Sequence, residues 1–182
     1  MELFEKLKYP INGLLFYFGW FAVVLYGASN HPLIAFALSL FVIILHFVWC
    51  TDKWLELLQV FTVVGIGFVV ETALIESGFL IYKSRVIWSP LPPLWILGIY
   101  GILSTTLNYS LTWVKKIPFV AAVCGAIGGA LSYRAGLFMG AVAFPKGEVK
   151  TLLVLGAVWF FLFPLICWVT NKPKAPKTPQ DL

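Results

Sequence analysis

Six apolar stretches dominate this 182-residue chain, and each is about as long as a helix that crosses a membrane. The hydrocarbon core of a bilayer requires roughly 20 consecutive apolar residues per helix. Only a few residues connect one stretch to the next, which leaves no room for a soluble domain. We therefore predict an all-α fold, a polytopic membrane bundle of six transmembrane helices. The predicted spans cover residues 10–28, 31–50, 55–77 (with an apolar extension to 82), 91–114, 117–144 and 152–170.

The composition excludes a soluble or a disordered protein. Hydrophobic residues make up 60% of the chain and charged residues only 12%, whereas a soluble domain carries about 25% charged residues. Disorder requires low hydrophobicity and high charge. In so apolar a chain the net charge of +5 indicates loops that fix orientation in a membrane, not nucleic-acid binding. We expect one transmembrane domain over residues 1–170 and a polar cytoplasmic tail over 171–182.

The distribution of lysine and arginine predicts the orientation. With the N-terminus inside, eight lysines lie in the cytoplasm and four basic residues lie outside, as the positive-inside rule requires. Both termini are therefore predicted to be cytoplasmic, and the simplest location is the inner (plasma) membrane of a bacterium. Aromatic residues are expected at both interfaces: Trp49, Trp54, Trp113 and Trp168 inside, and Tyr82, Trp88 and Trp95 outside.

Two charged residues within the predicted spans are the first candidates for a site. Glu71 and Arg134 each lie about 25 Å along a span that runs outward. An unpaired charge at this depth is costly, so the matched depth predicts an ion pair. Glu76, one turn further along, could share Arg134 or carry its own proton. The pair is either a structural clamp or part of a pocket in which Arg134 meets an anionic group.

Small residues surround Arg134 in the fifth predicted span. Gly125 and Gly129 form a small-xxx-small pair, as do Gly136 and Gly140. Such faces allow close helix packing, which predicts a central helix or a face for a membrane-protein partner. A helix break at residues 128–129 is the alternative. Ser132 and Tyr133 join Arg134 as candidate site residues.

A second polar layer is predicted toward the cytoplasm, and it contains Asn12, His46 and Asn108. The two asparagines are expected to form hydrogen bonds between helices. His46 and Cys50 share a helical face, but two ligands without a second pair do not make a metal site. We expect no metal and no cofactor. Phosphate-binding loops, His-Glu-x-x-His and Gly-x-Ser-x-Gly motifs are missing from the sequence, which favours a non-enzymatic protein.

Several motifs resemble those of domain-of-unknown-function family 2878. They are residues 10–14 (Pro-Ile-Asn-Gly-Leu) with Trp20, 92–95 (Pro-Pro-Leu-Trp), 111–113 (Leu-Thr-Trp) and 128–136 (Gly-Gly-Ala-Leu-Ser-Tyr-Arg-Ala-Gly). The resemblance extends from about Tyr9 to Thr170 and implies a small bacterial inner-membrane protein. Many members have a proline where this chain has Ala130. The resemblance implies no activity.

Three functions remain open from the sequence. The first is a non-enzymatic protein that binds or moves a small amphipathic or anionic molecule, for example a lipid, near Glu71 and Arg134. The second is the substrate-binding subunit of a larger transporter. The third is a lipid-modifying membrane enzyme or its accessory, in which Glu71 or Glu76 acts as acid or base.

Overall fold

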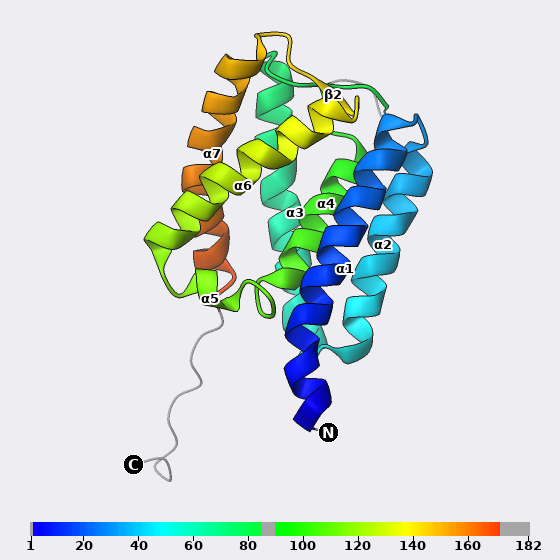
Figure 1. Cartoon of the computed structure of the whole chain (residues 1–182), viewed down its shortest axis with the longest axis vertical. Coiled ribbons are helices and arrows are strands. Elements are labelled where there is room, and N and C mark those ends of the chain that lie inside the picture. Colours follow the sequence, from blue (N-terminus) through cyan, green and yellow to red (C-terminus); the bar gives the residue numbers. More distant parts are fainter. Residues whose placement is uncertain (1, 85–89, 172–182) are drawn as a thin grey trace.

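The computed structural model describes residues 2–84 and 90–171. These residues form seven α-helices and one two-stranded sheet (Figure 1), so the predicted helical fold class is confirmed. Most of the predicted tail, residues 172–182, lies outside the described residues, as do Arg85 and Trp88.

Five helices are long and apolar enough to cross a membrane. Large apolar side chains cover their outer surfaces: Phe61, Phe119 and Phe161, for example, are each about 70% exposed. Such a surface suits contact with lipid, and the chain is a multi-pass membrane protein. The five helices are α1 (Glu2–Ala28), α2 (Pro32–Trp49), α3 (Lys53–Glu76), α6 (Pro118–Phe138) and α7 (Glu148–Val169).

The fourth predicted span, 91–114, is not one long helix. The helix α4 (Leu94–Thr106) has 13 residues and rises about 20 Å, less than the bilayer core of about 30 Å. A turn and the short helix α5 (Thr112–Lys115) follow it. The hydroxyls of Ser104, Thr105 and Thr106 each donate to the carbonyl three residues earlier, a local bond that competes with continuation of the helix.

The central helix of the bundle is α4, and not α6 as the small residues of the fifth predicted span suggested. α4 packs against α1, α2 and α3, whereas α6 packs mainly against α7. Glycines allow the close approach of α4 to α2: a Cβ at Gly98 would collide with Ser39, and one at Gly101 would lie 2.7 Å from Cδ1 of Ile43. The α6–α7 hairpin therefore stands beside a group of four helices (Figure 1).

A small antiparallel sheet closes one end of the bundle. It pairs β1 (Ile81–Tyr82) with β2 (Val142–Ala143). The predictions that the third and fifth spans extend to residues 82 and 144 are therefore wrong. Gly140 has a φ of +76°, which ends the α6 region in a turn that a residue with a side chain rarely adopts. α1 begins and α7 ends at the opposite end of the bundle (Figure 1).

Candidate functional site

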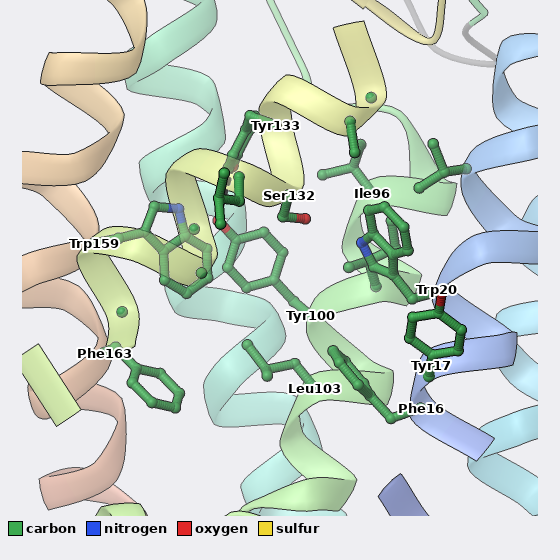
Figure 2. Close-up of a pocket in the computed structure, with 18 of the residues that line it drawn as sticks. Phe16, Tyr17, Trp20, Ile96, Tyr100, Leu103, Ser132, Tyr133, Trp159 and Phe163 are labelled. Atoms are coloured by element: carbon green, nitrogen blue, oxygen red, sulfur yellow. Dashed lines mark hydrogen bonds between the residues drawn. The ribbon is translucent and has the colours of Figure 1, made fainter. Parts of the chain in front are cut away.

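A cavity of about 520 Å³ lies between the α6–α7 hairpin and helices α1 and α4 (Figure 2). Aromatic and aliphatic side chains form most of its walls. Tyr82 of β1 and Val142 of β2 line its end beside the two-stranded sheet. Pockets that bind small molecules have volumes of about 300–1,000 Å³ and are mostly apolar, so the cavity has the size and character of a ligand site.

The cavity opens sideways between α1 and α6. Tyr17 of α1 and Leu131 of α6 both line it, and they are 61% and 57% exposed. Both residues lie well inside long helices that carry a lipid-facing surface. The opening at Tyr17 and Leu131 therefore lies on the apolar flank of the bundle, and Trp113 of α5, which also lines the cavity, is 58% exposed toward the end where α7 terminates.

The small residues of α6 both hold α7 in place and leave space for the cavity. A Cβ on Gly129 would collide with the indole of Trp159, and one on Gly125 would meet Phe163. Gly128 also lines the cavity, and a Cβ there would have no heavy atom within 4 Å. α6 is continuous over these residues. Close packing, the first of the two predicted roles, is therefore what the structure shows, and the helix break is not.

Glu71 is the polar centre of the cavity wall. Its side chain is fully buried in α3, and three tyrosyl hydroxyls donate hydrogen bonds to its carboxylate. Tyr82 donates to Oε2 at 2.7 Å and Tyr100 to Oε1 at 3.1 Å. Tyr133 also donates to Oε1. The four residues come from α3, β1, α4 and α6, so the cluster joins the sheet and the hairpin to the central helices.

The predicted ion pair between Glu71 and Arg134 is wrong. Arg134 is exposed on α6, and its Nε donates to Oε1 of Glu148 at 2.9 Å. The arginine also lies over the ring of Phe138. Tyr133, the preceding residue on α6, is the one whose side chain points to Glu71. Matched depth along two helices does not determine the rotation of either helix, and the rotation decides which of two neighbouring residues faces inward.

We predict that Arg134→Ala lowers the free energy of unfolding by less than about 1 kcal/mol, because exposed ion pairs contribute little. Denaturant unfolding of the detergent-solubilised protein measures this. Glu148→Ala removes the same ion pair and is expected to have an effect of the same small size. A loss of several kcal/mol in Arg134→Ala alone would restore the interpretation of Arg134 as a buried structural charge.

The remaining outer candidates divide between the cavity and the surface. Ser132 lines the cavity next to Tyr133. Glu76 is exposed at the end of α3, where the helix meets the loop to β1. Tyr82 and Trp95, predicted at the outer interface, are 3% and 1% exposed. They belong to the interior because Trp95 packs edge-on against Tyr82 and donates its Nε1–H to Ser84 O.

The predicted inner polar layer is a buried hydrogen-bond network. Nε2 of His46 lies 3.3 Å from Oε2 of Glu56, and Nδ2 of Asn108 donates to the other oxygen of Glu56 at 2.8 Å. Asn108 accepts from Nζ of Lys115, which also donates to the Thr170 carbonyl at 2.9 Å. The network therefore links α2, α3, the α4–α5 turn and the end of α7.

The expected interhelical bonds of the asparagines are confirmed. Nδ2 of Asn12 donates to the Thr105 carbonyl, and its Oδ1 accepts from the Ser110 hydroxyl. Asn108 also donates to Oε1 of Gln59. The asparagines thus hold α1 and α3 to the end of α4, on the side of the bundle away from the two-stranded sheet and Glu71.

The partners of these polar groups were not predicted from the sequence. Glu56 and Gln59 are polar residues inside an apolar stretch, and with Glu71 they share the buried face of α3. The spacing of these three polar residues along one face of a helix could have predicted that they are buried. Tyr100 and Trp159, whose rings stack at 5.8 Å in the cavity wall, carried no comparable signal, because aromatic residues are common throughout this chain.

The comparison with known proteins identifies a family of unknown function. A family model described as "Protein of unknown function (DUF2878)" matches residues 9–165, which is most of the chain. The resemblance carried by the sequence motifs is therefore confirmed. No curated protein and no solved structure matches the chain.

Proposed function

The chain belongs to the DUF2878 family of proteins of unknown function, and we propose that it binds a small amphipathic, membrane-partitioned molecule in the cavity between α1, α4, α6 and α7. The observation that carries the proposal is the cavity itself, with its apolar walls and the polar cluster at Glu71. Such a combination binds an apolar body and orients one polar group. We place the protein in the bacterial inner membrane with both termini cytoplasmic, on the basis of the lysine distribution.

The sideways opening supports a ligand that arrives through the bilayer. A molecule dissolved in the lipid would reach the mouth between Tyr17 and Leu131 without crossing the polar ends of the bundle. Arg134 does not line the cavity. The reason for expecting an anionic ligand there is thereby removed, and the amphipathic alternative is retained.

We predict that Gly128→Phe abolishes ligand binding without unfolding the protein. The glycine has open space around it and lines the cavity, so the new ring fills volume that the ligand needs. Gly65→Phe is the matched control, because Gly65 is exposed like Gly128 and a Cβ added to it would also have no heavy atom within 4 Å, but it lies on α3, outside the cavity lining.

The measurement is photo-crosslinking in lipid nanodiscs with a neutral long-chain alcohol that carries a diazirine in its chain. In the wild type and in Gly65→Phe we expect saturable labelling of cavity residues on α1, α4 and α6, and in Gly128→Phe we expect most of it to be lost. Equal labelling of all three proteins, or labelling spread over the lipid-facing surfaces alone, would contradict the proposed function.

A further inference from the structure

We propose that the molecule bound in this cavity is an organic cation, an ammonium group on an apolar body, with its positive charge beside Glu71. The inference rests on the proposed function and adds the chemical class of the ligand.

The charge of the cavity favours a cation. Of the described residues that line it, Glu71 is the only charged one. None of the ion pairs in the described part of the chain involves Glu71, and its partners there are the three tyrosyl hydroxyls. A carboxylate buried without a counter-charge is costly even when it is hydrogen-bonded. A bound cation would supply the missing charge at the place where the low dielectric makes the attraction strong.

The hydrogen-bond capacity of the cluster also favours a cationic ligand. The hydroxyls of Tyr82, Tyr100 and Tyr133 all donate to Glu71. The hydroxyls of Tyr100 and Tyr133 have then used their only protons, and what remains to each of these two are acceptor lone pairs. A ligand with N–H or O–H donors can bind to these lone pairs. A carboxylate or phosphate would find neither a positive charge nor a free tyrosyl proton.

Aromatic side chains near Glu71 provide a second attraction for a positive group. Tyr100 and Trp159 stack on each other with an angle of 19° between their rings, and Tyr133 lies beside them (Figure 2). Ring faces of tryptophan and tyrosine attract ammonium groups, and the attraction reaches about 2 kcal/mol when the site excludes water. The rest of the wall, toward Phe16 and Leu103, is apolar and suits a hydrocarbon body.

The test compares three labelled probes of equal chain length, dodecylamine, dodecanol and dodecanoate. Their affinities for the full-length protein are measured by equilibrium dialysis in phosphatidylcholine nanodiscs, with empty nanodiscs as the blank for partition into lipid. We expect dodecylamine to bind at least about tenfold more tightly than dodecanol, and dodecanoate to bind most weakly. Equal affinities for the amine and the alcohol, or tightest binding of dodecanoate, would overturn the proposal.

Glu71→Gln tests the charge of the site alone, because the glutamine side chain has nearly the same size and shape as glutamate but carries no charge. We expect it to abolish the advantage of dodecylamine over dodecanol. Glu76→Gln, on the exposed end of the same helix, is the matched control and should behave as the wild type. If Glu71→Gln does not fold, the probe ranking on the wild type still decides. Binding of the alcohol without preference for the amine refutes the inference alone, whereas saturable binding of no probe refutes the proposed function as well.

Discussion

Gly129→Ala is expected to lower the free energy of unfolding by about 1–3 kcal/mol, the usual cost of overpacking a well-packed interior. Gly128→Ala, one residue earlier, is expected to leave stability unchanged or to raise it by up to about 1 kcal/mol, because alanine is the better helix former. The two substitutions are chemically identical and adjacent on α6, so their difference isolates the contact between the hairpin helices.

The physical reason lies in the packing of α6 against α7. A Cβ on Gly129 would collide with the ring of Trp159 and would lie 2.8 Å from its Cβ. The Cβ of Trp159 is fixed to the backbone of α7, so rotation of the side chain cannot relieve the overlap. The helices would have to separate, and the wall of the cavity would move with Trp159. A Cβ on Gly128 would have no heavy atom within 4 Å, so the same substitution there causes no overlap.

Thermal or denaturant unfolding of the two variants in the same detergent checks this prediction. The ring stacking of Trp159 on Tyr100 provides a second measurement, since near-ultraviolet circular dichroism should change in Gly129→Ala and not in Gly128→Ala. Equal stabilities would mean that α6 and α7 do not approach as closely as the structure shows.

The helical class and most span boundaries could be predicted because they depend on local composition. Apolar runs of sufficient length define helices in a membrane protein, and five of the six predicted runs correspond to long helices. The exception, α4, is apolar enough, but it ends early in the run Ser104, Thr105 and Thr106, whose hydroxyls bond to the local backbone. A hydropathy window does not register such bonds.

The site was only partly predictable, because its assembly depends on tertiary packing. The burial of Glu71 followed from its place in an apolar span, and Tyr133 was among the candidate site residues next to Arg134. Its other two partners could not be predicted, because Tyr82 is brought to Glu71 by the pairing of β1 with β2, and Tyr100 by the packing of the short central helix α4. Arg134 was assigned to the interior, yet α6 turns Tyr133 inward and leaves Arg134 with Glu148. The rotation of a nearly uniformly apolar helix is not encoded in its own hydrophobic pattern, so it cannot be obtained from one sequence.

At the end of the bundle where α1 begins and α7 ends, Glu56→Ala is expected to be the most destabilising single change, and to lower the free energy of unfolding by about 3 kcal/mol or more. Its carboxylate accepts a hydrogen bond from Asn108 and lies against Nε2 of His46, and both Glu56 and His46 are at most 2% exposed. Removal of one member of a buried polar group leaves the others without compensation in a medium where water cannot replace it.

Glu76→Ala is the control, because Glu76 belongs to the same helix but is exposed at its other end. A change within about 0.5 kcal/mol is expected there, as for most surface substitutions. A double-mutant cycle with His46→Ala then measures how much of the loss belongs to the pair. We expect the double variant to lose less than the sum of the two single variants, because the second substitution removes the group that the first left unpaired. Strict additivity, or a loss from Glu56→Ala no larger than that from Glu76→Ala, would show that the network does not hold together the end of α2, the start of α3 and the end of α7.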